Sequence, residues 1–119
     1  MAQDPLVHLP LAPHDFHLLV SLADGPRHAY GLASAVEAQA PAGVRLEIGS
    51  LYRMLARLTT LALIEECEPA SREGGHEGRR RYYRITPFGR RVAQAEAARL
   101  QSALNLARRH KLIPGRRTS

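Results

Sequence analysis

The chain has 119 residues, 45% of them hydrophobic, which suits one globular domain and excludes disorder along its whole length. Its net charge is +6, and residues 61–119 hold thirteen Arg or Lys against six acids, while residues 1–60 hold four against five. Cys67 is the single cysteine, so an internal disulfide is excluded and a reducing compartment is indicated. No apolar run approaches the roughly 20 residues that span a bilayer, and the N-terminus lacks a signal-peptide pattern. We therefore expect a soluble, cytoplasmic protein.

Three helices are predicted after a loose arm over residues 1–12. The first covers 13–24, from Pro13 to the breaker Asp24-Gly25-Pro26. Its apolar stripe comprises Phe16, Leu19, Val20 and Leu22 with Ala23. The second covers 28–39, with Leu32, Ala35 and Val36 on one face. The third covers 48–61, with a buried stripe of Ile48, Leu51, Leu55, Leu58 and Ala62 and an outer side of Ser50, Arg53, Arg57 and Thr60.

Two strands and a long helix complete the chain. Strands over 64–68 and 79–86 flank a turn-rich segment without an apolar anchor, as in a hairpin. Alternation directs Ile85 to the core with Tyr83 beside it, and leaves Arg80 exposed. Thr86-Pro87 then starts a helix over 87–112, and residues 113–119 form a tail that we expect to be disordered. The helix over 87–112 carries a narrow apolar stripe at coiled-coil spacing. This stripe predicts dimerisation through Ala93, Ala97, Leu100, Leu104 and Ala107.

Three helices followed by a hairpin predict a mainly α fold with a small β-hairpin, a winged helix-turn-helix over 13–86. In that fold the third helix presents its polar side to a major groove, and a basic wing contacts the neighbouring phosphates or minor groove. The competing interpretation of the same pattern is a solvated basic loop on an unrelated α/β domain. The pattern favours DNA binding over that alternative.

Three segments resemble the PadR-like family of bacterial transcriptional regulators, in the family's order and over about residues 14–112. They are Ala23–Leu32, Gly49–Leu58 and Arg80–Gly89. The resemblance, to the compact form with a single C-terminal helix, implies a winged helix-turn-helix, a dimerisation helix and usually repression of a nearby promoter. The chain departs from the family at Ala29, where Gly is common, and at Glu47-Ile48, where Ser or Gly followed by Pro is usual. The second departure leaves the third helix without its usual cap.

The resemblance and the position of the third helix together predict a DNA-binding set: Tyr30, Ser50, Tyr52, Arg53, Arg57, Arg79, Arg80 and Arg81. Several roles stay open. Tyr30 either touches a phosphate or packs between the second and third helices, and Tyr52 either reaches a base or belongs to the core. Arg57 is expected to bind the DNA backbone. Arg84 is expected either to act in the wing or to pair with one of three glutamates, Glu65, Glu66 or Glu68.

These observations predict a homodimeric regulator, expected to be a repressor, that binds a pseudo-palindromic double-stranded operator. The alternatives are a protein-interaction module on a winged-helix scaffold and a nonspecific architectural DNA binder. We expect no enzyme activity, because no phosphate loop follows a strand and every Asp lies near the N-terminus. We expect no cofactor and no metal site, because His8, His14 and His17 have no zinc-binding spacing. The identity of a small-molecule effector, and whether there is one, is left open.

Overall fold

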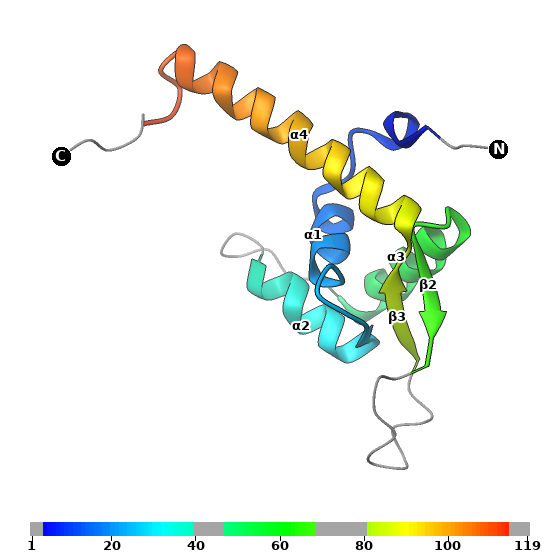
Figure 1. Cartoon of the computed structure of the whole chain (residues 1–119). Helices are drawn as coiled ribbons and strands as arrows, with labels where there is room; N and C mark the ends of the chain where they lie inside the picture. The colour runs from blue at the N-terminus through cyan, green and yellow to red at the C-terminus, as the bar shows by residue number, and fades with distance from the viewer. Residues whose placement is uncertain (1–3, 40–46, 69–80, 115–119) are drawn as a thin grey trace.

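A computed structural model of the chain describes residues 4–39, 47–68 and 81–114 (Figure 1). In chain order the elements are η1 (Pro5–His8), α1 (Pro13–Ser21), β1 (Arg27–His28), α2 (Ala29–Gln39), α3 (Ile48–Thr60), β2 (Ile64–Cys67), β3 (Tyr82–Ile85) and α4 (Pro87–Arg109). The predicted fold class is confirmed: three short helices and a small antiparallel sheet, followed by one long helix. None of the helices in these three ranges is long and apolar enough to cross a membrane.

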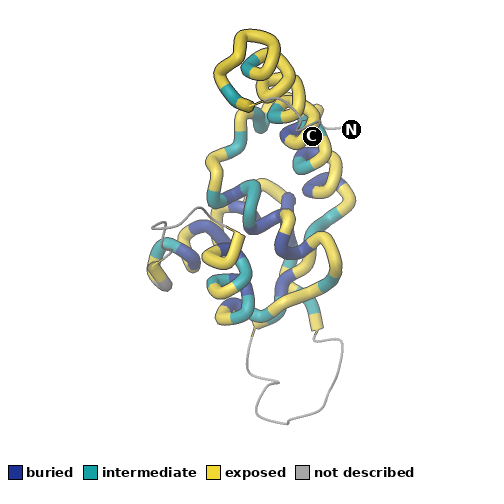
Figure 2. Tube along the Cα trace, turned by 90° about the vertical axis from the view of Figure 1, so that its left-hand side faces the viewer, coloured by how far each residue is buried: buried dark blue, intermediate teal, exposed yellow. Residues whose placement is uncertain are grey.

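The core is formed mainly by leucines where the short helices meet the sheet and the start of α4. Its fully buried side chains include Leu18, Leu32, Leu51, Leu58 and Val92. Figure 2 shows buried residues concentrated in the body, while the far half of α4 is almost entirely exposed. The core therefore holds α3 from one side only and leaves its opposite side accessible.

The apolar stripe predicted for the first helix is partly wrong. Leu18, which the prediction omitted, is completely buried, whereas Val20 is 40% exposed and Ala23 is exposed too. The physical reason is that α1 packs against both α2 and α4, so two neighbours select its buried residues rather than one. The helix also ends at Ser21 instead of residue 24, because Leu22 caps it and Gly25, at φ 154°, redirects the chain.

The third helix ends at Thr60, and Ala62 does not belong to its buried stripe. Ala62 adopts a left-handed conformation at φ 64° and is exposed. The amide of Leu63 donates to the carbonyl of Leu58 across this turn at 3.0 Å, which satisfies the helix end and directs the chain into β2. The other predicted stripe leucines are buried, and Met54, which the prediction omitted, joins them at 7% exposure.

The sheet has three strands in the order β1-β3-β2, all antiparallel. The predicted hairpin is confirmed over Ile64–Cys67 and Tyr82–Ile85, within the expected ranges, and Tyr83 is buried as predicted. The strand β1 was not predicted: its two residues pair with Tyr82 and Tyr83, so the stretch after Gly25 closes the sheet. Residues 79–80 of the predicted second strand lie outside the described residues.

The long helix α4 joins the core through its first half and projects from it with its second. Thr86 caps it as predicted, and its buried residues are Phe88, Gly89, Val92 and Glu96. Figure 1 shows the second half extending away from the body. The helix ends at Arg109 rather than at residue 112, because Lys111 takes a left-handed conformation at φ 61° and the Leu112 amide bonds back to Ala107.

Where a loose arm was predicted, the chain from η1 onward contacts α4, which corrects that prediction. The η1 turn contacts that helix, and the rings of His8 and Phe88 meet edge-on at 5.5 Å. Glu96 of α4, 2% exposed, accepts a hydrogen bond from the Leu11 amide and forms an ion pair with Arg99 at 2.8 Å. The Arg99 hydrogen bond, with the Leu11 amide, lowers the pKa of Glu96 although burial opposes this.

Candidate nucleic-acid interface

The side of α3 opposite its leucines is a continuous exposed surface. At 100° per residue, the positions that point furthest from the buried face are Gly49, Arg53, Ala56 and Thr60, and all four are exposed. We call these four residues the outer stripe. Gly49 and Ala56 carry little or no side chain, so the helix can approach a groove floor closely with Arg53 between them. The sequence analysis identified Arg53 and Thr60 but missed Gly49 and Ala56. The signal that could have found them is the helical spacing of four, three and four residues along the outer stripe.

The first two turns of α3 carry the predicted residues Ser50 and Arg53. The Arg53 guanidinium donates to the Ser50 hydroxyl at 3.1 Å, which holds both side chains near the start of the helix. Glu47 occupies the N-cap position without a side-chain hydrogen bond, as the missing cap in the sequence predicted. The Glu47 side chain therefore leaves the amides of the first turn to other acceptors.

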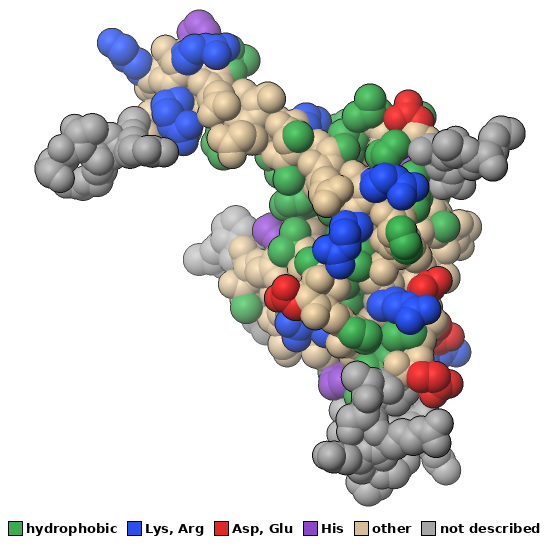
Figure 3. Space-filling model, in the orientation of Figure 1, with side chains coloured by type: hydrophobic (Ala, Val, Ile, Leu, Met, Phe, Trp, Pro, Cys, Tyr) green, Lys and Arg blue, Asp and Glu red, His purple; other side chains and the backbone are tan. Residues whose placement is uncertain are grey.

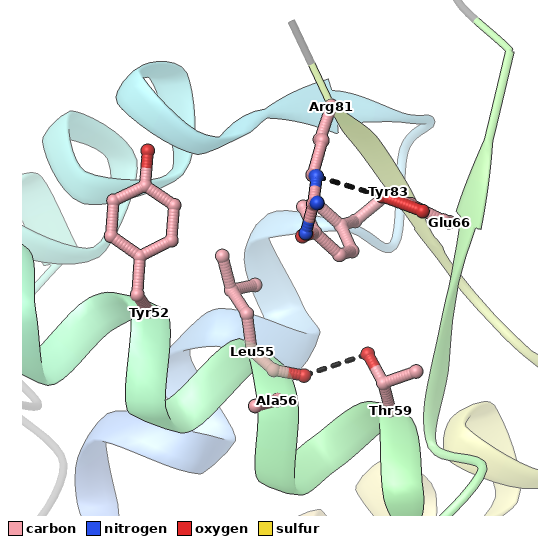
Figure 4. A pocket seen from close by; sticks show the side chains of 7 residues that line it. All are labelled: Tyr52, Leu55, Ala56, Thr59, Glu66, Arg81 and Tyr83. Atoms are coloured by element: carbon pink, nitrogen blue, oxygen red, sulfur yellow. Dashed lines mark hydrogen bonds and ion pairs between the residues drawn. The ribbon is translucent and has the colours of Figure 1, made fainter.

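A groove of about 310 Å³ separates the flank of α3 from the base of the wing (Figure 4). Tyr52, 46% exposed, stands on the helix side, which answers the open question by placing it outside the core. Arg81 lies on the wing side, where it pairs with Glu66 at 3.3 Å. A hydrogen bond to Tyr83, reinforced by the charge of Glu66, raises the pKa of the Arg81 guanidinium. The Arg81 guanidinium and the Tyr52 phenol thus face each other across a groove that is open to solvent.

Arg57 lies on the other flank of α3 and already has a partner. Its two terminal nitrogens donate to the two carboxylate oxygens of Asp15 in α1, each at 2.8 Å. These hydrogen bonds raise the pKa of the guanidinium although burial opposes this. Arg57 was predicted to bind the DNA backbone, but in the structure its guanidinium binds Asp15 of the same protein. Sequence reasoning missed this pair, because 42 residues separate its members and no local pattern links them.

The remaining predicted DNA contacts are scattered. Tyr30 is 61% exposed in the first turn of α2, so it does not pack between α2 and α3 as one alternative held. Arg84 pairs with Glu65 at 2.6 Å, which selects one of the three predicted glutamates. Arg79 and Arg80 lie outside the described residues.

The predicted dimerisation residues divide between the two halves of α4. Ala93 packs half-buried against the protein's own core. Further along, Ala97 and Leu104 are exposed, and Leu100 and Ala107 are half-buried. Figure 3 shows Lys and Arg side chains gathered at the projecting end of this helix, where Arg108, Arg109 and Lys111 lie. An apolar stripe with a basic end is therefore accessible.

The described residues contain no group of three or more His, Cys, Asp or Glu that could hold a metal ion. His17 contacts Gln39 at 3.4 Å, and His8 packs on Phe88. Two of the N-terminal histidines thus make contacts within the protein.

Comparison with known proteins identifies the family of the chain. The model of the transcriptional regulator PadR-like family matches residues 18–95. A protein of Streptomyces fradiae, the uncharacterized 37.1 kDa protein in transposon TN4556, is 40% identical over 80 residues. That match covers 67% of this chain but 21% of the relative, so the chain spans about a fifth of that protein's length.

Solved structures show the same fold. A PadR family transcription regulator from hypervirulent Clostridium difficile R20291 matches with a TM-score of 0.70 and 19% identity, over 83% of this chain and 98% of that one. A PadR family regulator from Eggerthella lenta DSM 2243 matches with a TM-score of 0.65 and 23% identity, over 93% and 90%. A cysteine-to-serine mutant of MarR from E. coli reaches a TM-score of 0.69 at 17% identity, over 93% and 72%. The chain belongs to the PadR-like family of transcriptional regulators, which are not enzymes.

Proposed function

We propose that this protein is a homodimeric, sequence-specific DNA-binding regulator that represses nearby genes. The observation that carries the proposal is the outer stripe of α3 with Arg53 at its centre. Within the described residues Arg53 has no carboxylate partner, whereas Arg57, Arg81 and Arg84 each have one. A guanidinium in the first turns of an exposed helix is the group that best recognises guanine in a major groove.

Two further features support the same reading of the interface. The groove between Tyr52 and Arg81 lies beside the outer stripe, where a phosphate strand would run between recognition helix and wing. The predicted wing cations Arg79 and Arg80 directly precede Arg81 in the chain. We assign base contacts to the helix and backbone contacts to the wing.

The dimer is proposed from the second half of α4. An apolar stripe on a helix that projects from its own domain is stabilised when a second copy covers it. Two recognition helices would then read half-sites with centres about 10 base pairs apart, or a multiple of that spacing. Replacing both Leu100 and Leu104 with Glu should give monomers in analytical ultracentrifugation. A dimer that survives the double substitution would place the interface elsewhere.

Selection from a random duplex pool tests the function directly. Enrichment of one palindromic sequence supports the proposal. No enrichment despite binding supports a nonspecific architectural DNA binder, and no binding to any duplex supports a protein-interaction module.

Two single substitutions test the division of roles. Arg53→Ala should abolish discrimination between the operator and a scrambled duplex, whereas Arg80→Ala should weaken binding to both alike. Binding should also weaken steeply as salt rises from low to physiological concentration. Equal loss of discrimination in both variants would show that the roles are assigned wrongly.

A further inference from the structure

Asp15 is one of the few acidic side chains that the fold buries, and its position is informative. It lies in the first turn of α1, and its side chain is 7% exposed. A carboxylate there is favoured by the N-terminus of the helix, but one charge at a helix end does not require a partner 42 residues away. The partner is Arg57, in the third turn of the proposed recognition helix.

Asp15 and Arg57 form a bidentate ion pair. Both carboxylate oxygens accept, and both terminal guanidinium nitrogens donate, at 2.8 Å each. Because the guanidinium is planar and rigid, two parallel bonds fix direction as well as distance. Asp15 and Arg57 also line a hollow of about 410 Å³ between the start of α1 and the flank of α3, beside Arg53.

From this geometry we infer that Asp15 and Arg57 position the recognition helix, and that Arg57 is a positioning residue rather than a DNA contact. The inference rests on the proposed function, since it concerns how α3 is presented to DNA. The pair sets the rotation of α3 about its own axis and thereby aims Arg53.

The rotation of α3 needs a directional contact because, among the described residues, the side chains that pack it on the core are apolar. Leu51, Leu55 and Leu58 hold α3 to the core, but apolar packing has no strong directional preference. With side chains the helix has a radius of about 5–6 Å, so a roll of about 20° moves its outer surface by about 2 Å. Hydrogen bonds to base edges tolerate much less than that. A directional tie on the flank of α3 therefore acts on the sequence preference of the helix.

The ion pair of Arg57 with Asp15 is lower in free energy than a contact of Arg57 with a DNA phosphate. If Arg57 turned toward a phosphate, it would leave a carboxylate buried without a partner. That penalty exceeds what an exposed phosphate contact returns. On the helix wheel Arg57 also points toward α1, about 70° away from the direction shared by the outer stripe.

The test compares Asp15→Asn and Arg57→Lys with the wild-type protein, on the selected operator and on a scrambled duplex. Asn keeps the shape of the acid but removes its charge, and Lys keeps the positive charge but cannot form two parallel bonds. If the pair positions α3, each variant should lose about tenfold or more of the ratio between operator and scrambled affinities, the scale of one lost base contact. Affinity for the scrambled duplex, and its dependence on salt, should stay at the wild-type values.

A direct phosphate contact predicts results of the opposite kind. Asp15→Asn would then free Arg57 and strengthen binding to both duplexes, and Arg57→Lys would keep the wild-type ratio. Either result, or an unchanged ratio in both variants, overturns the inference. Asp24→Asn is the matched control, because it removes the same charge from an exposed position and should leave the ratio unchanged.

Folding and function are separated within the same experiment. Circular dichroism checks that each variant is folded at the assay temperature, and if Asp15→Asn is not, Arg57→Lys decides. If the wild-type protein itself selects no operator, the proposed function fails. If it selects one and the variants retain its ratio, only the positioning role fails.

Discussion

Gly89 in the first turn of α4 is expected to be intolerant of any side chain. Its amide donates to the Thr86 hydroxyl at 2.8 Å, which holds the turn against the entry to β2. A Cβ at this position would lie 1.9 Å from the carbonyl oxygen of Leu63 and 2.8 Å from its carbonyl carbon. Even a 3.0 Å contact would require the two backbones to separate by about 1.1 Å. No flexible side chain can yield, because the obstacle is backbone.

Two opposing effects decide the size of the loss in Gly89→Ala. Overpacking a tight site costs about 1–3 kcal/mol and sometimes more, and here the clash is severe. Ala in place of Gly returns up to about 1 kcal/mol of helix propensity, less in a first turn. The clash prevails, so we expect a net loss of about 2 kcal/mol. For a chain of this size that lowers the Tm by about 6–12 °C.

The assay is thermal unfolding followed by circular dichroism at a fixed protomer concentration, since a dimer makes the Tm depend on concentration. Gly31→Ala is the matched control: its Cβ would meet the His28 ring at 3.7 Å, an ordinary contact, so the Tm should stay level or rise. Equal Tm values for the two variants would refute the reasoning, because the close approach to Leu63 would then carry no energetic weight.

Three other predictions concern single contacts. Thr86→Ala should lose about 1–2 kcal/mol of stability in urea unfolding, because the hydroxyl both caps α4 and donates to the Ala62 carbonyl at 2.6 Å. Glu96→Gln should flatten the loss of stability in acid. The Glu96 pKa is lowered in the fold, so its contribution is present above its ordinary value of 4.5 and disappears as the pH falls through the folded value. Glu66→Gln should strengthen binding to every duplex by about two- to fivefold, because it frees Arg81.

Each of these has a control within the chain. Thr86→Ser keeps the hydroxyl and should retain most of the stability, and a loss equal to that of the Ala variant would assign the effect to the methyl group. For Glu96→Gln, the difference from the wild-type midpoint should narrow as the pH falls, and a constant difference would contradict the pKa argument. The control for Glu66→Gln is Glu65→Gln, which removes the same charge from the neighbouring residue of β2. Glu65 pairs with Arg84, and strand alternation places it on the other face of the hairpin. Equal gains in affinity from both glutamate variants would mean that general charge, rather than Arg81, is responsible.

Sequence periodicity predicted the elements that bury a single face. The leucine stripe of α3 and the alternation around Tyr83 are of this kind, because burial on one side imposes the period of the helix or strand directly. The first helix packs against both α2 and the long helix α4, and it buries Leu18 where the prediction had Val20. The two-residue strand β1 is too short to show any alternation.

The candidate site was predictable where its residues share one element or match a family motif. Ser50, Tyr52 and Arg53 share one helix, and helical geometry is enough to place them together. Asp15 is joined to Arg57 by tertiary structure alone, and its position early in a helix fits a favourable dipole contact equally well. A pairwise contact of this kind can change the role expected of a residue, here Arg57, while the predicted fold stays the same.

Ion pairing also changes what the charge count means. By composition, the positive excess lies in residues 61–119, which points to the wing, α4 and tail as the sources of affinity. In the structure, Glu65, Glu66 and Glu96 each neutralise one arginine of that half, and Asp15 neutralises Arg57. On α3, the cation left without a carboxylate among the described residues is Arg53, in the half of the chain whose net charge is negative. Under the proposed function, discrimination between sequences depends on this side chain, because carboxylates hold Arg57, Arg81 and Arg84.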